Sequence, residues 1–170
     1  LNLKNAQGVN VLSEINFDVK AGEIVAIAGV SGNGQSELLE VIAGMCLDKT
    51  DHLNGSIKLG EQAITFNKAD PTLPAKLRRL GLGHVPEDRL RDGVVKDFSV
   101  WENLLLGQQS DQIYLDKKSC NAAADALLEQ FEVRPMDSSL RISQLSGGNQ
   151  QKVVMAREIA AKPKVLLVGQ

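Results

Sequence analysis

The sequence of 170 residues predicts an α/β fold. An apolar run over residues 24–28 predicts a strand that is buried on both faces. A glycine-rich loop follows this run, and apolar residues at helical spacing then continue to about residue 42. A second apolar run, residues 165–168, comes directly after another helical pattern. Strands that alternate with helices in this way are typical of α/β proteins.

The loop after the first apolar run has the glycine spacing of a phosphate-binding loop. In the pattern G-x-x-x-x-G-K-[ST], Gly29 and Gly34 hold the glycine positions, and Ser36 holds the hydroxyl position. Gln35 stands where the pattern has lysine, so the fixed positive charge is missing. Backbone N–H groups and a helix N-terminus can still bind phosphate. The alternative is a glycine-rich turn without a ligand. A G-x-G-x-x-G dinucleotide loop fits less well, because Glu37 stands at its third glycine.

Composition and charge narrow the class of protein. The chain is 43% hydrophobic and 24% charged with a net charge of −2, which predicts a globular, soluble domain and no nucleic-acid partner. The longest apolar runs are far shorter than the roughly 20 residues of a membrane span. Short basic clusters, including Arg89 and Arg91, predict solvated faces. Cys46 and Cys120 lack metal-ligand spacing, and Cys46 is expected to be buried.

A small antiparallel β region is expected at the N-terminal side. Strands are predicted over residues 1–5 and 11–19, and again over 56–59 and 64–66, after the turn signal Asn54-Gly55. The expected core residues of the second strand are Leu12, Ile15, Phe17 and Val19.

Helices dominate the predicted second half. A helix over 71–80 is expected to begin at the N-cap Asp70, and a short strand over 82–85 follows it. Ser99 and Glu102 have the spacing of a capping box for a helix over 100–106.

A further helix is predicted over residues 121–131, because its apolar residues recur at helical spacing. Together with the helix over 100–106 it predicts an inserted helical subdomain, about residues 98–145.

A second glycine-bearing helix start lies at Ser146. Gly147 and Gly148 follow it in the first turn of a helix predicted to run to Ala161. Each of these glycines destabilises a helix by about 1 kcal/mol relative to alanine. A helix that keeps both glycines indicates that its N-terminal backbone must stay free of side chains so that a ligand can approach. Anion binding is the use that this arrangement indicates. The alternative is an ordinary capped helix with a flexible start.

Because it has both glycine-rich segments, the chain resembles the nucleotide-binding domain of ATP-binding cassette (ABC) transporters. The segment Leu145–Gln150 resembles the ABC signature, and Pro86–Arg89 stands where that family has its Q-loop. The order of phosphate loop, helical subdomain, signature and Walker B strand matches over essentially the whole chain. The resemblance implies one domain over residues 1–170, with a P-loop NTPase fold of ABC type and a mixed sheet. The Pro-Glu-Asp-Arg segment and Asn149–Gln151 resemble the second cassette of tandem sugar and nucleoside importers.

Several positions depart from the family pattern. Gln35 replaces the phosphate-binding lysine, and Glu87 replaces the Q-loop glutamine. Gly169 and Gln170 stand at the places of the Walker B aspartate and the catalytic glutamate, so no catalytic residue is intact. No aromatic residue precedes Leu12 to stack on adenine, and Val9 is the nearest apolar candidate. The chain is expected to be an excerpt from a longer polypeptide, because it ends just after the Walker B strand.

The resemblance implies ATP and Mg²⁺ as cofactors, with Ser36 and Glu87 as weak metal ligands. The implied nucleotide-binding residues are Val9, Gly29, Val30, Ser31, Gly32, Asn33, Gly34, Gln35 and Ser36. The implied signature residues, which would serve a partner's nucleotide, are Leu145, Ser146, Gly147, Gly148, Asn149 and Gln150.

ABC cassettes work as head-to-tail pairs, so the resemblance implies a degenerate cassette of a sugar or nucleoside importer that completes its partner's ATP site. Alone it is expected to hydrolyse ATP weakly or not at all. The implied partners are a second cassette on the same polypeptide, transmembrane permease subunits and, indirectly, a solute-binding protein, at the cytoplasmic side of the plasma membrane. One alternative is a regulatory scaffold that binds nucleotide without turnover. The other is a soluble ABC-family ATPase without a membrane partner.

Overall fold

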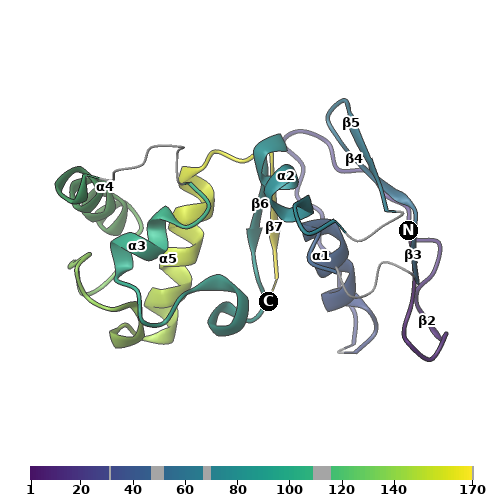
Figure 1. Cartoon of the computed structure of the whole chain (residues 1–170), viewed down its shortest axis with the longest axis horizontal. Coiled ribbons are helices and arrows are strands. Elements are labelled where there is room, and N and C mark those ends of the chain that lie inside the picture. The colour runs from purple at the N-terminus through teal and green to yellow at the C-terminus, as the bar shows by residue number, and fades with distance from the viewer. Residues whose placement is uncertain (31, 47–51, 67–69, 109–115, 170) are drawn as a thin grey trace. The chain divides into compact units, whose positions relative to one another are not determined.

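The computed structural model describes residues 1–30, 32–46, 52–66, 70–108 and 116–169. The chain divides into two compact units, Leu1–Leu80 and Gly81–Gln170. Figure 1 shows the helices and strands of both units.

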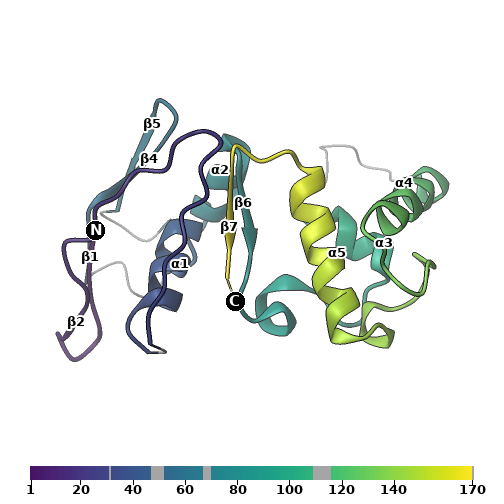
Figure 2. The ribbon, with the colours of Figure 1, turned by 180° about the vertical axis from the view of Figure 1, so that it is seen from behind.

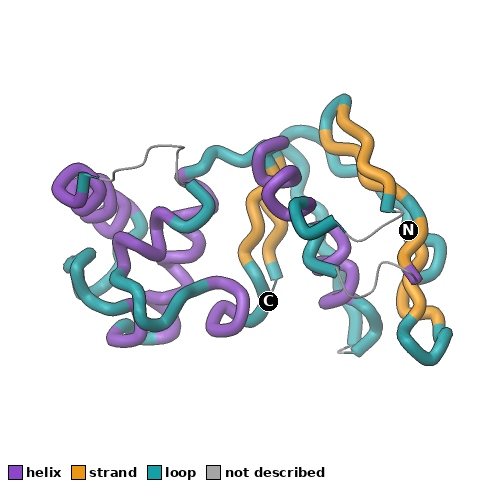
Figure 3. The backbone as a smooth tube through the Cα atoms, in the orientation of Figure 1, coloured by secondary structure: helices purple, strands orange, loops and turns teal. Residues whose placement is uncertain are grey.

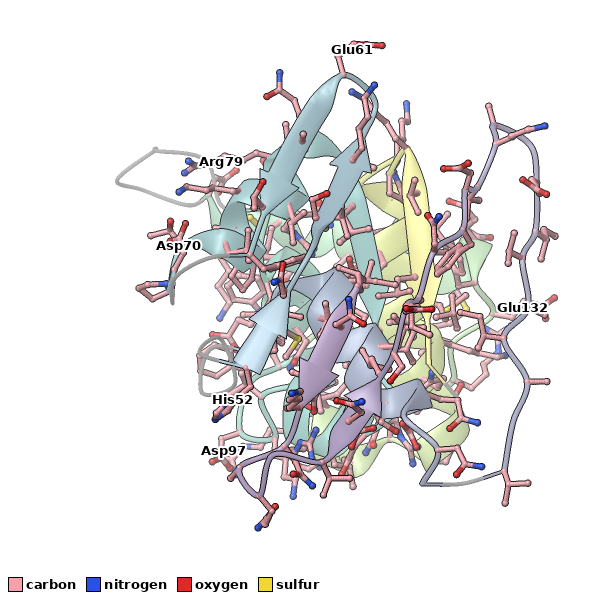
Figure 4. The ribbon with its side chains drawn as sticks, turned by 90° about the vertical axis from the view of Figure 1, so that its right-hand side faces the viewer. His52, Glu61, Asp70, Arg79, Asp97 and Glu132 are labelled. Carbon is pink, nitrogen blue, oxygen red and sulfur yellow. The ribbon has the colours of Figure 1, made fainter. Side chains whose placement is uncertain are left out.

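The first unit contains the small antiparallel β region that the sequence predicts. Strands β1 (Asn2–Lys4), β2 (Asn10–Leu12) and β3 (Leu53–Asn54) form one sheet in the order β2-β1-β3. Strands β4 (Ser56–Leu59) and β5 (Gln62–Thr65) pair as a separate antiparallel hairpin. In Figure 4, Glu61 lies at the tip of this hairpin, and its side chain points away from both strands.

Two helices complete the first unit. Helix α1 (Gln35–Ala43) buries Leu38 and Val41, and helix α2 (Leu73–Leu80) buries Leu77. Gly44 ends α1 with a φ of 75°, and a Cβ at this position would lie 2.9 Å from side-chain atoms of α2. A glycine is therefore needed where the end of α1 meets α2.

The N-cap predicted at Asp70 is wrong, because α2 begins at Leu73 rather than at residue 71, and Asp70 lies before the turn that leads into the helix. Its carboxylate accepts hydrogen bonds from the Lys76 ammonium, at 2.7 Å, and from the Thr72 hydroxyl and N–H. These contacts, the one with Lys76 first, lower the pKa of Asp70 to about 2.

The strand predicted over residues 24–28 is wrong. No strand or helix is found between residues 13 and 34 in the described part of this segment, and Figure 3 shows it as loop. Ile24 is 96% exposed rather than buried. A strand requires a neighbouring strand to take its backbone hydrogen bonds. The described strands of the first unit pair only among β1, β2 and β3 and between β4 and β5.

The second predicted strand is also shorter than expected, because β2 ends at Leu12. Leu12 is buried and Ile15 is half-buried, but Phe17 and Val19 are each 44% exposed and do not belong to the core. The prediction assigned these apolar residues to the core side of a strand, and a strand buries a side chain only where a second layer covers that face.

The second unit joins a parallel strand pair to a group of helices. Strands β6 (Leu82–Val85) and β7 (Val165–Val168) lie side by side in parallel, which both Figure 1 and Figure 2 show. The chain between them forms the η2 turn (Arg89–Gly93), helices α3 (Val100–Leu105) and α4 (Lys117–Gln130), the η3 turn (Ile142–Gln144) and helix α5 (Gly147–Ala160). The centre of their shared core includes Val85, Val100, Leu128, Ile142 and Val154.

In the second unit, the predicted helix starts are confirmed with one correction. Ser99 and Glu102 form the capping box of α3, and the hydrogen bonds from Ser99 lower the pKa of Glu102. Helix α4 begins at Lys117 rather than Asn121, because the Asp116 carboxylate accepts from the N–H groups of Lys118 and Ser119.

A fully buried polar side chain, Asn103, ties the segment before α3 to the helix. Its Oδ1 accepts from the N–H of Val95 at 2.9 Å, and its Nδ2 donates to the carbonyls of Val95, Phe98 and Ser99 at 3.0–3.4 Å. The side chain therefore replaces the backbone pairing that this irregular segment lacks.

We predict that Asn103→Leu destabilises the chain by about 3 kcal/mol, since it leaves several buried backbone groups without partners. Urea unfolding followed by the fluorescence of Trp101, the single tryptophan, measures this. Gln130→Leu is the control, because Gln130 is exposed at the end of α4, and it should change stability by less than about 0.5 kcal/mol. Equal unfolding midpoints for the two variants would contradict the role of Asn103.

Candidate functional site

The glycine-rich loop leads directly into α1. Gly34 is the N-cap of α1 with a φ of 95° and no side-chain cap. A Cβ on Gly34 would lie 2.9 Å from the carbonyl oxygen of Val11, so only glycine fits both the backbone angle and the approach of β2. The first turn of α1 thus keeps N–H groups without intrahelical acceptors, as an anion-binding loop requires.

The side chain at the missing lysine position folds back over the loop. Gln35 Nε2 donates to the carbonyl oxygen of Val30 at 3.2 Å. It also lies 2.0 Å from where a Cβ on Gly29 would stand. The absence of a side chain at Gly29 therefore makes room for the Gln35 amide. This amide is a neutral donor, so it ties the loop together without adding positive charge.

The other residues predicted for this site are placed as follows. Val30 is 75% exposed, and Gly32, Asn33 and Ser36 lie on the same loop and at the start of α1. Val9 is 60% exposed just before β2, the strand that approaches Gly34. Ser31 lies outside the described residues.

In the second unit, Gly169 packs against the backbone after β6. Its N–H donates to the carbonyl of Val85 at 2.9 Å, which extends the parallel pairing by one step. A Cβ on Gly169 would lie 2.7 Å from the backbone nitrogen of Glu87. The position at which the resemblance places the Walker B aspartate therefore has no room for a side chain. Gln170, at the place of the catalytic glutamate, lies outside the described residues.

The start of α5 is open to an approaching ligand. Gly148 is exposed, and nothing lies within 4 Å of a Cβ built on it. Ser146 is the N-cap, and its Oγ accepts from both the N–H of Asn149 at 3.5 Å and its Nδ2 at 2.9 Å. Because two donors already point at the hydroxyl oxygen, its own proton is directed elsewhere. The helix start therefore combines a hydroxyl donor with bare first-turn N–H groups.

Of the other residues predicted for the signature, Leu145 and Gln150 are buried and Asn149 is half-buried. Leu145 is 5% exposed and belongs to the core of the second unit. Gln150 is buried, and its Nε2 donates to two carbonyls of the segment before the helix at 3.0 and 3.2 Å. Asn149 Oδ1 accepts from the N–H of Arg134 at 2.9 Å. These three side chains hold the helix start in place, whereas Ser146 and Gly148 are exposed and Gly147 is half-buried beside Arg89.

Arg89 was missed as a site residue, because its basic cluster predicted a solvated face. Its Nη2 lies 2.5 Å from where a Cβ on Gly147 would stand, and its Nε is buried. The signal was its position two residues after Glu87, in the segment that resembles the Q-loop.

A buried ion pair fixes the η2 turn against α5. Arg157 Nε donates to Glu158 Oε1 at 2.8 Å, and Arg157 Nη1 donates to the carbonyls of Gly93 and Asn103 at 2.8 and 3.3 Å. Glu158 Oε2 in turn accepts from the N–H of His84 on β6 at 3.2 Å. The turn that carries Arg89 is thereby held against the helix that carries the signature.

Two further observations concern metal and membrane. In the described ranges, no group of three or more His, Cys, Asp or Glu side chains is placed to hold a metal ion. None of the helices in the described residues is long and apolar enough to cross a membrane.

Comparison with known proteins identifies the fold and the family. The chain is 43% identical to the nucleoside import ATP-binding protein NupA of Lactococcus lactis subsp. cremoris, with all of the chain and 33% of the relative covered. It is 39% identical to the guanosine import ATP-binding protein NupO of Bacillus subtilis, again with all of the chain and 32% of the relative covered. The chain thus spans about a third of the length of these relatives.

Solved structures agree with the α/β fold predicted from the sequence. A dimeric ATP-binding cassette, MJ0796, in a post-hydrolysis state bound to ADP and Pi matches with a TM-score of 0.75 and 27% identity. The match covers 98% of this chain and 72% of that one. The model of the family "ABC transporter" matches residues 12–168. This chain belongs to the ABC transporter family.

Proposed function

We propose that this chain is one ATP-binding cassette of an importer for nucleosides or sugars, and that it is the degenerate member of a pair. The names of its relatives, nucleoside and guanosine import ATP-binding proteins, support this class of solute. The family match runs from residue 12 to 168, which supports one cassette over residues 1–170. Helices α3 and α4 fall within the helical subdomain proposed at about residues 98–145.

The proposal rests on a contrast between the start of α5 and the positions expected to perform chemistry. The start of α5 is open and presents a hydroxyl and bare backbone, whereas the positions that would perform chemistry within this chain are neutral or closed. Gln35 offers an amide in place of a cation, and the backbone of Glu87 fills the space beside Gly169. Phosphoryl transfer depends on cations and positioned groups that stabilise the developing charge. A cassette with these features can serve a partner's nucleotide better than its own.

The chain's own nucleotide would lie at residues 29–36, with Val9 beside the base. The turn of Gly34 and the uncapped start of α1 support phosphate binding there. Bound Mg²⁺ would neutralise phosphate charge, and Ser36 is its proposed protein ligand in this unit. The Gln35 amide would contact phosphate as a neutral donor, so we propose weak ATP binding and little or no hydrolysis at this site.

The partner's nucleotide would meet the residues Leu145 to Gln150. In this arrangement Ser146 and the N–H groups of Gly147 and Gly148 contact the terminal phosphate, while the other three residues hold the helix start. A partner cassette on the same polypeptide is consistent with the chain spanning about a third of its relatives' length. Permease subunits, an indirectly linked solute-binding protein, and a peripheral position at the cytoplasmic side of the plasma membrane complete the proposal.

A second candidate function is a regulatory scaffold that binds nucleotide and never turns it over. The observation that favours it is the Gln35 side chain, which folds onto the loop and donates to Val30. ATP hydrolysis by the full-length polypeptide separates the two candidates, because a regulatory scaffold would leave it insensitive to changes at the signature.

We predict that Gln35→Lys tightens ATP binding about 10- to 100-fold without producing hydrolysis. The ammonium can still donate to the loop, and it adds a charge-assisted contact to phosphate worth roughly 1.5–3 kcal/mol. Calorimetric titration with Mg-ATP measures the affinity. Gln62→Lys, at an exposed position of the β4–β5 hairpin, controls for added charge and should leave the affinity unchanged. Equal affinities for both variants would show that residues 29–36 do not bind phosphate.

We predict that Gly169→Asp, which restores the family's aspartate, lowers stability and restores no activity. Its Cβ would lie 2.7 Å from a backbone nitrogen that cannot move aside cheaply, and such overpacking costs about 1–3 kcal/mol. Urea unfolding and phosphate release measure the two effects. Gly169→Ala introduces the same clash without charge, and its loss of stability should be similar. A stable, hydrolysing Gly169→Asp variant would disprove this account of the position.

The proposal itself is tested by Gly147→Asp in the full-length polypeptide. We expect a loss of ATP turnover of about 100-fold or more, because a carboxylate would face the incoming phosphate. Stability should be retained, since an acidic residue suits a helix N-terminus and the nearest atom is the far end of the Arg89 side chain, which carries the opposite charge. Turnover, ATP affinity and thermal stability are measured on the same preparation.

Ala161→Asp provides the matched control for Gly147→Asp, because it adds the same charge at an exposed position after the other end of α5. It should leave turnover unchanged. If Gly147→Asp hydrolyses ATP as fast as this control, Ser146 is only a helix cap and the chain does not act on a partner's nucleotide.

A further inference from the structure

The Arg89 guanidinium lies against the first turn of α5 in an unusual electrostatic position. Its Nη2 lies 2.5 Å from the place where Gly147 would carry a Cβ. The helix N-terminus carries a partial positive charge, so a cation beside it is repelled. Gly147 therefore leaves room for a charged group that the helix alone does not favour.

No hydrogen bond joins the Nε of this guanidinium to any of the described residues. Its Nε is one of two buried side-chain polar atoms that lack a hydrogen bond there, the other being Asn121 Oδ1. The neighbouring arginines differ, since Arg91 pairs with Asp92 and Arg157 pairs with Glu158, both at 2.8 Å. A buried N–H without an acceptor requires an explanation, and an acceptor that binds from outside is one.

The backbone around Arg89 is held in place before any ligand arrives. Asp88 caps the η2 turn by accepting from the N–H groups of Leu90 and Arg91 at 2.9 and 3.2 Å. The carbonyl of Arg89 accepts from the N–H of Val94 at 2.9 Å. At the end of the turn, Arg157 Nη1 donates to the carbonyl of Gly93 at 2.8 Å. The position of Arg89 is therefore built into the second unit by both ends of its turn.

We propose that Arg89 binds the terminal phosphate of the nucleotide that the signature completes. This inference rests on the proposed function, and it adds a cation to a site for which the sequence indicated only a hydroxyl and backbone N–H groups. A phosphate accepts from a guanidinium, from the Ser146 hydroxyl and from first-turn N–H groups. It also removes the repulsion between the guanidinium and the helix. Arg89 binds and neutralises charge, and it transfers no proton and forms no covalent bond.

The test compares Arg89→Ala, Arg89→Lys and Arg91→Ala in the full-length polypeptide. Arg91 is the matched control, because it lies on the same turn but pairs with Asp92. We expect Arg89→Ala to lower kcat for ATP about 100-fold, the loss typical of one removed charge-stabilising donor, with KM nearly unchanged. Arg89→Lys should keep an intermediate rate, since it retains the charge without the planar fork. Arg91→Ala should turn over normally.

Two further readouts distinguish phosphate binding from a structural role. The thermal midpoint of Arg89→Ala should equal or exceed that of the parent protein, because a repelled cation has been removed. Added ethylguanidinium should raise the ATP turnover of Arg89→Ala at least tenfold and leave that of Arg91→Ala unchanged. A lowered midpoint without such rescue would mean that Arg89 only supports the fold, and it would overturn the inference.

The same assays on Gly147→Asp separate this inference from the proposed function. If Gly147→Asp is inactive while Arg89→Ala is fully active, the signature acts on the partner's nucleotide without Arg89, and only the inference fails. If both variants hydrolyse ATP normally, the proposed function and the inference fail together.

Discussion

The buried Arg157–Glu158 pair is the interaction on which the second unit depends. From one helix, α5, it reaches the η2 turn, the carbonyl of Asn103 and the backbone of β6. Charges this deeply buried are tolerated only when they are paired and hydrogen-bonded, and here each bond also fixes a separate segment. The open start of the same helix is held separately, by the contacts of Leu145, Asn149 and Gln150.

The sequence predicted those features that depend on local chemistry. The capping box at Ser99, the N-cap at Ser146 and the strands β6 and β7 all follow from side chains that act on nearby backbone or from short apolar runs. The resemblance to ABC cassettes likewise depended on short segments with fixed spacing, and the family match confirms it.

The predictions that were wrong, and the contacts that the sequence did not reveal, have a different physical origin. A strand over residues 24–28 required a partner strand, and no local pattern specifies one; the same holds for the burial of Phe17 and Val19. The contact between Arg89 and Gly147 joins residues far apart in the sequence, so it could not be read from spacing. The Gln35 amide, in contrast, contacts Val30, only five positions away. This contact could not be predicted either, because the side-chain rotamer of Gln35 depends on the space left by Gly29.

The close packing at Gly169 has a consequence for the history of the chain. Any side chain introduced at residue 169 by one substitution would meet the backbone of Glu87 at once, so the segment after β6 would have to shift first. Neither change alone would be favoured by selection, because the first is destabilising and the second brings no benefit without it. Substitutions at residue 169 and in the segment after β6 are therefore expected to occur together, so that this pair of positions changes as one unit or not at all.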